Sequence, residues 1–536
     1  MSAGAGSKPE TGPGGESEGR AVTQGERGGR RVSRRHALGL AGKGAAGAVV
    51  LGAVGGAGYG IRGSSAAAPA PPQAVAPRLT QTIQTRPDLN PPHVQMVDID
   101  SGSSSGYIFV TPSRVPGIRS MTTKQAIAAG DGAQGAMILD HLGKLVWFHP
   151  TPGLATDLQV QTYRGEPVLT YWTGAIENGI GYGEVAILDS TYKQIATIKG
   201  ANGLKADLHE IVLTPQDTAI VTAYTTRAAD LSAIGGPANG QVFDSVVQEI
   251  DVATGKLVHE WRSLDHVPVT ETYSKPAKGA LDYFHVNSAS LYDDNHLLLS
   301  SRSTWTLYKV DRSTGAVVWR LGGKNSDFTI GKGANFEWQH HSRRLANGRI
   351  TVFDDGAVPA VESTSRALIL NVDETHMTAT LDKAYIHPAQ LLAGYEGSVQ
   401  VLANGHVFVG WGDEPYFTEF SPDGSVLLDG RFPTDDQSYR AFRSPWVGRP
   451  TSAPTIVAAK DSVGGVAIHA SWNGATEVAH WQVLGGETPQ DLKPVALLAK
   501  AGFETAMTAR TTGKYVAVAA LDVHGTRLGV SRAVAI

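Results

Sequence analysis

Hydrophobic residues in this chain fall into short runs separated by turns rich in glycine, asparagine and aspartate. Such runs predict β-strands, because strands are short and bounded by turn residues. The clearest set comprises four expected strands, at 286–291, 296–302, 304–311 and 316–321. The last turn of this set, Arg312-Ser-Thr-Gly315, ends on a glycine that tolerates positive φ between two strands. Four strands in succession are typical of one blade of a β-propeller.

The spacing of polar residues that open these sets indicates a repeat. Four segments begin on a polar residue, run to a leucine, turn and re-enter as a hydrophobic run. His341 follows His285 by 56 residues, and Ser398 follows His341 by 57. A period of this length indicates a repeat architecture. We expect six four-stranded sets, at about 105–149, 157–199, 208–263, 285–321, 339–384 and 398–431.

The fold class expected is therefore all-β, a six-bladed β-propeller followed by a small β-sandwich. The propeller is predicted over residues 93–449, with five or seven blades as alternatives because the first set is irregular. After Pro454 the strands shorten, and residues 450–536 are predicted to form a separate β-sandwich. Trp472-Asn-Gly followed by Trp481-Gln-Val resembles a fibronectin type III module, a type of domain that usually serves as an adhesive or structural spacer.

The N-terminal region differs in composition from the rest of the chain. Residues 1–68 contain a polar start, the basic run Arg31-Val-Ser-Arg-Arg35 and an uncharged stretch at 44–61. This order predicts a twin-arginine export signal with cleavage near Ala68. A membrane anchor over 44–61 is the alternative, although the many glycine and alanine residues favour only weak insertion. Residues 69–92 are predicted to be a linker, and the protein is expected to be secreted or held in the cell envelope.

Net charge and composition exclude several kinds of partner and several kinds of site. A formal net charge of −4 gives no electrostatic reason to expect a nucleic-acid partner. The absence of cysteine excludes disulfides, thiolate metal ligands and thiol nucleophiles. The histidines lack the local spacing of metal motifs, so we expect no metal site, and nothing in the sequence calls for a cofactor.

The repeat predicts that the polar openings meet at one mouth of a central channel. They are His209, His285, His340 or His341, and Ser398. Only one of His340 and His341 can face the channel, because adjacent strand residues point to opposite faces. The alternative to a functional role is that each histidine is a structural hydrogen-bonding group. It applies most to His209, whose neighbour Glu210 offers a salt link.

Two arginines, Arg302 and Arg366, lie close in sequence to these openings. Histidine and arginine together predict a site for an anion, because the guanidinium fork binds sulfate or phosphate oxygens with charge-assisted hydrogen bonds worth about 1.5–3 kcal/mol each. Imidazole can serve as nucleophile, base or acid near neutral pH. Trp172 is the aromatic residue that we expect to stack on an aromatic ligand.

Several motifs resemble the arylsulfotransferase family, in the branch common in actinobacteria and fungi. The resemblance covers roughly residues 85–450. It is carried by Asp282-Tyr-Phe-His285-Val-Asn-Ser, Leu-Ser-Ser-Arg302, Trp319-Arg-Leu-Gly, Trp-Gln339-His340, Phe-Asp-Asp-Gly356, Ser365-Arg366, Gly410-Trp-Gly and Ser438-Tyr-Arg-Ala. It implies an exported six-bladed propeller that moves a sulfuryl group from an aryl sulfate to a histidine and then to a phenol.

The resemblance also implies roles for individual residues. His285 and His340 would bind the sulfuryl oxygens or move protons, and Arg366 would balance the charge of the transferring group. Gln339, His341, Ser398, Trp172, His209 and Arg302 are the candidates for substrate binding. Small aryl sulfates and phenols would be the substrates, and the C-terminal module could contact carbohydrate or the cell envelope.

One feature departs from the family pattern. The family's nucleophilic histidine should stand near Ser398, where this chain has none. His406 follows at the wrong end of its strand, and His387 lies in the preceding loop. Three interpretations remain: a transferase that uses another histidine such as His340 or His387, a site that binds an anionic aromatic ligand without turnover, or a non-catalytic secreted propeller that binds a ligand or cell surface.

Overall fold

The computed structural model describes residues 79–114, 134–433, 436–462 and 464–536. The predicted export signal at 1–68 and the alternative anchor at 44–61 lie outside the described residues. Within them the fold is all-β and built from many small, mainly antiparallel sheets, which confirms the predicted class. The helical segments are short: α2 (Ser263–His266) and the 3-10 turns η1 (Ser232–Ile234) and η2 (Val269–Glu271). No helix among these four stretches is long and apolar enough to cross a bilayer.

Four consecutive sheets follow the sequence order of their strands. The first comprises β5 (Leu154–Tyr163), β6 (Glu166–Glu177), β7 (Ile180–Leu188) and β8 (Gln194–Ile198). The second comprises β9 (Ile211–Leu213), β10 (Thr218–Ala229), β11 (Gly240–Asp251) and β12 (Leu257–Arg262). The third comprises β13 (Val286–Asp293), β14 (His296–Ser301), β15 (Thr306–Asp311) and β16 (Val317–Gly322). The fourth comprises β18 (His340–Arg344), β19 (Ile350–Asp354), β20 (Arg366–Asp373) and β21 (Thr378–Tyr385), with β17 (Thr329–Ile330) added in parallel.

Two further sheets contain strands from distant parts of the chain. In one, β22 (Ser398–Val401), β23 (Val407–Gly410), β24 (Tyr416–Phe420) and β25 (Val426–Arg431) are joined by β1 (Gln95–Ile99). In the other, β2 (Tyr107–Val110), β3 (Gly135–Leu139) and β4 (Leu145–Pro150) are joined by β26 (Ala441–Ser444). The irregular first set thus takes one strand from residues 441–444, and Phe109 pairs with Phe442 in its register.

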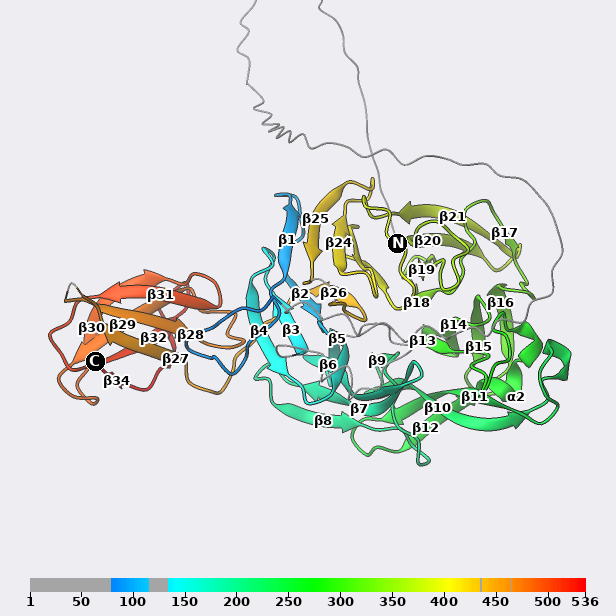
Figure 1. Cartoon of the computed structure of the whole chain (residues 1–536), viewed down its shortest axis with the longest axis horizontal. Helices are drawn as coiled ribbons and strands as arrows, with labels where there is room; N and C mark the ends of the chain where they lie inside the picture. The colour runs from blue at the N-terminus through cyan, green and yellow to red at the C-terminus, as the bar shows by residue number, and fades with distance from the viewer. Residues whose placement is uncertain (1–78, 115–133, 434–435, 463) are drawn as a thin grey trace, which may run out of the picture. The chain divides into compact units, whose positions relative to one another are not determined.

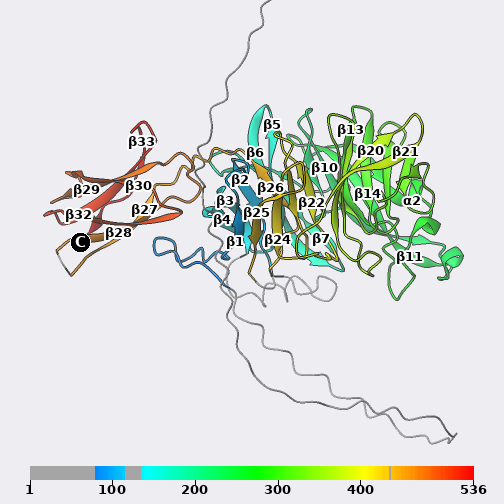
Figure 2. The ribbon, with the colours of Figure 1, turned by 90° about the horizontal axis from the view of Figure 1, so that it is seen from above.

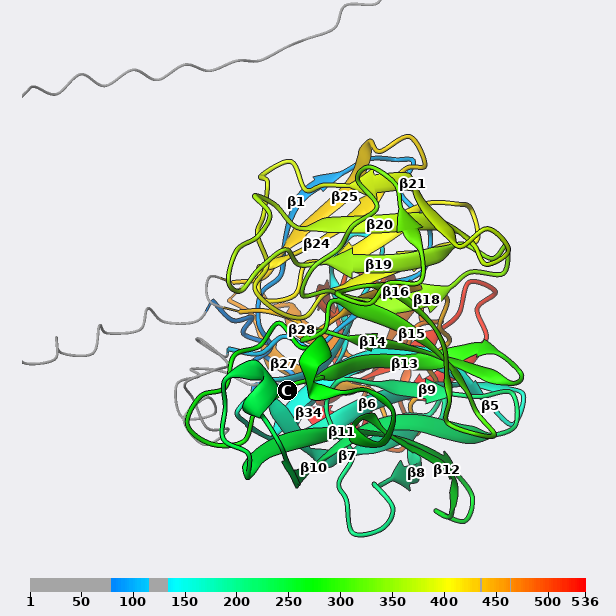
Figure 3. The ribbon, with the colours of Figure 1, turned by 90° about the vertical axis from the view of Figure 1, so that its right-hand side faces the viewer.

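Each of these six sheets has one edge strand, called its first strand, that lies near a common centre (Figure 1). These strands are β5, β9, β13, β18, β22 and β26. Strand β5 contacts β26 and β9, β13 contacts β10 and β18, and β22 contacts both β18 and β26. The circuit of contacts is therefore closed. Figure 2 shows β24 beside its sheet partner β25, and Figure 3 shows β18–β21 next to β13–β16. Large buried side chains such as Trp172, Trp261, Trp319 and Trp411 fill the sheets.

The remaining strands form two sheets near the C-terminus. One contains β27 (Thr455–Lys460), β28 (Val466–Ser471) and β31 (Glu504–Ala509). The other contains β29 (His480–Gly486), β30 (Lys493–Ala499), β32 (Tyr515–Leu521), β33 (Arg527–Val530) and β34 (Val534–Ala535). One hydrophobic core includes Ile468 from the first sheet and Trp481 and Val518 from the second.

Part of the predicted linker is packed. Residues 69–78 lie outside the described residues, but in 79–92 the side chains of Ile83 and Leu89 are buried. The backbone N–H of Thr85 donates to a carboxylate oxygen of Glu504 at 2.7 Å. This segment is therefore anchored where composition alone predicted a flexible connection.

Candidate active site

A cavity of about 320 Å³ lies at the ends of the first strands of five sheets. His209, His285, Glu396 and Tyr439 each come one or two residues before such a strand, and His340 begins one. Ile176, Asn178 and Gly179 add a wall from the β6–β7 hairpin. Segments far apart in the sequence therefore contribute polar side chains to one cavity.

Each of the three cavity histidines has a carboxylate at Nδ1. His285 Nδ1 lies 2.5 Å from Asp282 Oδ2, and His340 Nδ1 lies 2.9 Å from Asp355 Oδ2. His209 Nδ1 is hydrogen-bonded to Asp207. With Nδ1–H donating to the carboxyl oxygen, each ring carries its proton on Nδ1. In that tautomer the lone pair is on Nε2.

The three Nε2 atoms differ in what they contact. His340 Nε2 accepts the backbone N–H of Glu396 at 3.3 Å. Within the described residues, Nε2 of His209 and of His285 makes no hydrogen bond. The rings of His209 and His285 lie 4.7 Å apart between centroids and are nearly perpendicular. Two imidazole nitrogens are thus available to a ligand, and the third is engaged.

The surroundings shift the pKa values of two of these histidines and of Asp207. Burial lowers the pKa of His285, although Asp282 opposes that shift. Burial and the charge of Arg302 hold the pKa of His340 well below its ordinary value. Burial acts to raise the pKa of Asp207, but the charge and hydrogen bonds of His209 outweigh it, so the net shift is downward. At neutral pH, His285 and His340 are neutral and Asp207 is ionised.

Arg302 supplies a positive charge to the cavity. Its Nη2 donates to the carbonyl oxygens of Gly394 at 3.0 Å and of Ala357 at 3.3 Å. The guanidinium carbon lies 4.7 Å from the Trp338 ring and 5.2 Å from the Tyr395 ring. Carbonyl oxygens and aromatic faces hold the guanidinium in place. A desolvated guanidinium of this kind favours an anionic ligand.

A sequence model of the Arylsulfotransferase (ASST) family matches residues 159–433, about half of the chain. The chain belongs to the arylsulfotransferase family. The matched region contains β6–β25 and most of the cavity, from Ile176 to Glu396, whereas Tyr439 lies beyond it.

No curated protein matches this arylsulfotransferase family member. Three solved structures share some of its architecture. A protein of unknown function from Bacteroides caccae is 11% identical, with a TM-score of 0.37, and the match covers 63% of this chain and 98% of that one. The Myceliophteria thermophila Cps50 (Swd1) β-propeller domain is 12% identical, with a TM-score of 0.30, over 56% and 94% of the chains. Virginiamycin B lyase from Staphylococcus aureus is 9% identical, with a TM-score of 0.24, over 61% and 83%.

Four of the residues singled out by sequence line the cavity: His209, His285, His340 and Arg302. Arg366 does not. Its Nε and Nη2 donate to Asp354 Oδ2 at 2.9 and 2.6 Å, and Nη2 also donates to the Asn335 carbonyl. The guanidinium that the family resemblance gave a charge-balancing role is therefore held in an ion pair outside the cavity.

The other predicted binding residues brace the sheets. Gln339 Nε2 bonds to Ser300 and Ser301 in the neighbouring sheet. Ser398 Oγ donates to the carbonyl of Ala441. None of these residues lines the cavity.

His341 and Trp172 also lie away from the cavity. His341 Nδ1 accepts the N–H of Val399 at 3.2 Å. Trp172 is fully buried, and its indole N–H donates to Ala206. Of the adjacent pair His340 and His341, only the first faces the ligand space.

The alternative nucleophile His387 is also outside this cavity. It is buried against Trp411 and Tyr416, and its Nε2 lies 3.2 Å from Asp429. Glu210, expected beside His209, instead accepts from Arg440 at 2.9 Å and from Arg343 at 2.8 Å. Arg440 also bonds to Asp157, so a buried ion network joins the first strands below the cavity.

Sequence reasoning assigned no role to the carboxylates of the site. Asp207 and Asp282 stand two and three residues before their histidines, which is a local signal that could have been used. Asp355 lies 15 residues from His340 and meets it only through pairing of β18 with β19. Glu396 and Tyr439 stand just before β22 and β26, and the same register that marked His209 could have found them.

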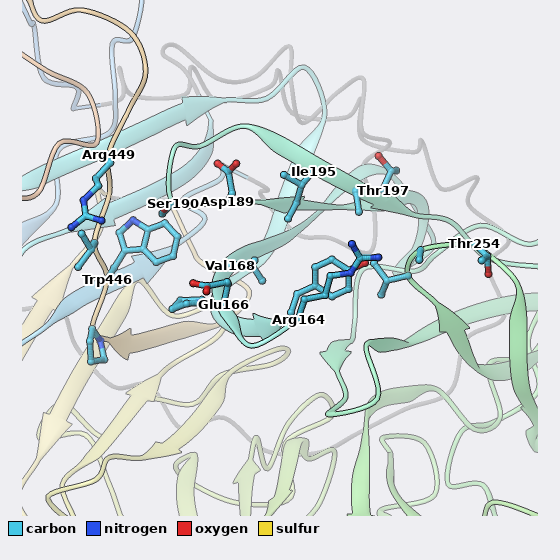
Figure 4. A pocket seen from close by; sticks show the side chains of 18 residues that line it. Arg164, Glu166, Val168, Asp189, Ser190, Ile195, Thr197, Thr254, Trp446 and Arg449 are labelled. Carbon is cyan, nitrogen blue, oxygen red and sulfur yellow. The ribbon is translucent and has the colours of Figure 1, made fainter. Parts of the chain in front are cut away.

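A larger cavity, of about 1090 Å³, lies elsewhere on the surface between β6, β8 and the segment before β27 (Figure 4). Trp446 and Arg449 line one side, and Arg164 and Thr254 the other. Arg449 is bonded to Glu477 through Nε and Nη2. No residue predicted for the site lies there, and no buried group aimed into it identifies an occupant.

Proposed function

We propose that this protein transfers a sulfuryl group from an aryl sulfate to a phenol in the cavity formed by His209, His285 and His340. One observation carries the proposal: three imidazoles and the guanidinium of Arg302 meet in one cavity of an arylsulfotransferase family member. Neutral imidazole provides a nucleophile, and the guanidinium stabilises a sulfuryl group whose oxygens carry negative charge.

His285 is the nucleophile in this proposal. Its Nδ1–H is held by Asp282, its Nε2 lone pair is not engaged, and burial keeps the ring neutral by lowering its pKa. In the first step Nε2 attacks sulfur, an N–S bond forms and the S–O bond to the aryl oxygen breaks. The aryl oxygen leaves with the bonding pair and takes up a proton. In the second step a phenol loses its proton, attacks sulfur and restores the imidazole.

Arg302 binds the sulfuryl oxygens. It is placed by two carbonyls and two aromatic rings. A charge-assisted hydrogen bond from its guanidinium would contribute about 1.5–3 kcal/mol. His209 lies beside Asp207, and its ring is 4.7 Å from that of His285, so it shapes the space next to the nucleophile. His340 is a positioning residue, because its Nε2 is used by the Glu396 backbone.

Nitrophenyl sulfate with phenol as acceptor tests this function. We expect wild-type protein to release nitrophenol and form phenyl sulfate, and His285→Ala to lose at least about a thousandfold in rate, since a missing nucleophile leaves only binding and electrostatic effects. Without acceptor, wild type should gain the mass of one SO₃ group on a peptide containing His285. His376→Asn is the matched control, because His376 is exposed on the β20–β21 turn.

A non-catalytic binding propeller is the second candidate, and the missing histidine at the opening of β22 favours it. Under that function nitrophenyl sulfate would bind to wild type and be displaced by sulfate, without nitrophenol release in any acceptor. Turnover that survives unchanged in His285→Ala would instead refute the assignment of the nucleophile.

We further propose that the six sheets from β1 to β26 are the blades of one propeller and that the last two sheets form a fibronectin III-like sandwich. The closed circuit of first strands and the core shared by β28, β29 and β32 support this. Export through the twin-arginine signal before Ala68, in the manner of the actinobacterial and fungal branch, is also a proposal. Replacing Arg34 and Arg35 by lysine should leave the protein inside the cell, and the exported protein should begin near residue 69.

The C-terminal sandwich is proposed to contact carbohydrate or the cell envelope. Residues 450–536 form sheets separate from those that carry the cavity, which supports a spacer or adhesive role. Retention of the exported protein on washed cell walls, compared with a chain that ends at residue 449, tests this role.

A further inference from the structure

Glu396 occupies the place that a histidine occupies in an earlier sheet. His209 stands two residues before β9, and Glu396 stands two residues before β22. Both side chains line the same cavity. The segment just before Ser398 therefore contributes a polar residue to the cavity, and this residue carries a carboxyl group instead of an imidazole.

The local backbone holds Glu396 in this position. Its φ is 71°, a left-handed value that is costly for a residue with a side chain, and Gly397 follows with φ of 99°. Its N–H donates to His340 Nε2 at 3.3 Å. Both carboxyl oxygens accept from Gln437 Nε2, at 3.0 and 3.1 Å. The strain is consistent with a side chain placed for a purpose.

The carboxyl has no cationic partner. Glu396 is 6% exposed and, within the described parts of the chain, forms no ion pair. Burial holds its pKa well above the ordinary value, and the nearby charge of Asp413 acts in the same direction. The other titratable groups whose charges couple to it are Asp355 and Tyr439, and His340 meets its backbone. These surroundings favour the protonated carboxylic acid of Glu396 over its carboxylate.

We infer that Glu396 is a further catalytic residue of the proposed transfer, the acid that protonates the departing aryl oxygen and the base that deprotonates the acceptor phenol. The inference rests on the proposed function. As the S–O bond breaks, the aryl oxygen takes the proton of the Glu396 carboxyl and leaves as a phenol, and Glu396 becomes a carboxylate. When an acceptor phenol attacks the sulfur on His285, its proton returns to Glu396. Proton and charge are balanced over one cycle.

Two of the cavity histidines and the arginine are less suited to this proton transfer. His285 Nε2 forms the N–S bond, and His340 Nε2 is engaged by a backbone N–H. Arg302 does not give up a proton in a protein. The acid extends the donors of this site to sulfate esters of weakly acidic phenols, whose oxygens leave poorly as anions. Activated esters such as nitrophenyl sulfate need this help least.

Glu396→Gln tests the inference with two donors, phenyl sulfate and 4-nitrophenyl sulfate. General acid catalysis contributes about 10²–10⁴-fold, so we expect that loss in kcat with phenyl sulfate and less than about tenfold with 4-nitrophenyl sulfate. Retained nitrophenol release shows that the variant is folded. Glu396→Asp, which keeps the acid, should recover part of the phenyl sulfate rate. Glu487→Gln is the matched control, because Glu487 is exposed in the C-terminal sheets.

Equal slowing of the two donors, or no slowing of either, overturns the role of Glu396 while leaving the proposed function intact. A steep dependence of the wild-type rate on the acidity of the leaving phenol also overturns it, and this measurement needs no variant. Wild type that turns over neither donor refutes the proposed function and the inference with it.

Discussion

Nδ1 of His285 lies 2.5 Å from Oδ2 of Asp282. The carboxyl oxygen accepts a hydrogen bond from Nδ1–H. The lone pair of the ring is therefore on Nε2, which points away from Asp282 toward the cavity. This one contact converts a histidine at the start of a strand into a candidate nucleophile. Asp207 and Asp355 make the corresponding contact with His209 and His340.

Asp282→Asn should lower kcat by about 10²–10⁴-fold with little change in KM. The amide can donate to Nδ1, which moves the imidazole proton to Nε2 and removes the nucleophilic lone pair, as in other carboxylate–histidine pairs. Initial rates with nitrophenyl sulfate measure the effect. Asp373→Asn, beside the exposed His376, is the matched control and should leave the rate unchanged. A rise in KM alone would show that Asp282 only shapes the binding space.

Arg302→Lys should weaken binding of aryl sulfates by about 10–100-fold, equivalent to the loss of one charge-assisted hydrogen bond. Lysine keeps the charge but loses the planar group that lies against Trp338 and Tyr395. Titration calorimetry with a non-reactive aryl sulfonate measures the dissociation constant. Unchanged affinity would mean that the anion lies elsewhere in the protein.

Arg366→Met should destabilise the protein by about 3–5 kcal/mol without removing sulfuryl transfer from the fraction that remains folded, because it leaves Asp354 buried without its cation. Urea unfolding and specific activity, measured on the same preparation, separate the two effects. Changing Asp354 to Leu in the same chain should recover much of the stability. Loss of turnover at unchanged stability would restore Arg366 to the role implied by the family.

Asp413→Asn should change how stability depends on pH. Burial raises the pKa of Asp413 to about 6, whereas an unfolded aspartate titrates near pH 4. Between those values the folded protein holds the extra proton, so this group makes the free energy of unfolding fall as pH rises. The variant lacks that fall, and its stability relative to wild type should improve from about pH 4 to about pH 6. A difference that stays constant over this range would contradict the assigned pKa.

The sequence was most informative about strand sets and their openings. The strands predicted at 286–321 agree closely with β13–β16, because each run is hydrophobic and the last turn ends on Gly315, which adopts positive φ. The register of the openings led to His209, His285 and His340, all of which line the cavity. The spacing of hydrophobic runs and polar openings can be read directly from the sequence.

Long-range pairing was less accessible. Nothing around residues 441–444 indicates that they pair with β2, and the sequence does not show that Arg366 is bonded to Asp354. The carboxyl of Glu396 was missed because the search at Ser398 looked only for histidine. The first two cases depend on contacts that the spacing of residues in the sequence does not reveal. The third was missed because carboxylates were not considered at that position.

Strand β26, the only strand after residue 433 in the sheet of β2–β4, is made late in synthesis. Until the ribosome has added residue 441, the edge of β2 lacks its hydrogen-bonding partner, and unpaired edges invite association with other chains. A stop codon between residues 432 and 441 would keep every strand of the five other sheets but leave the circuit of sheets open. Such nascent fragments should depend on chaperones or be degraded, whereas a chain that reaches residue 444 can complete its ring.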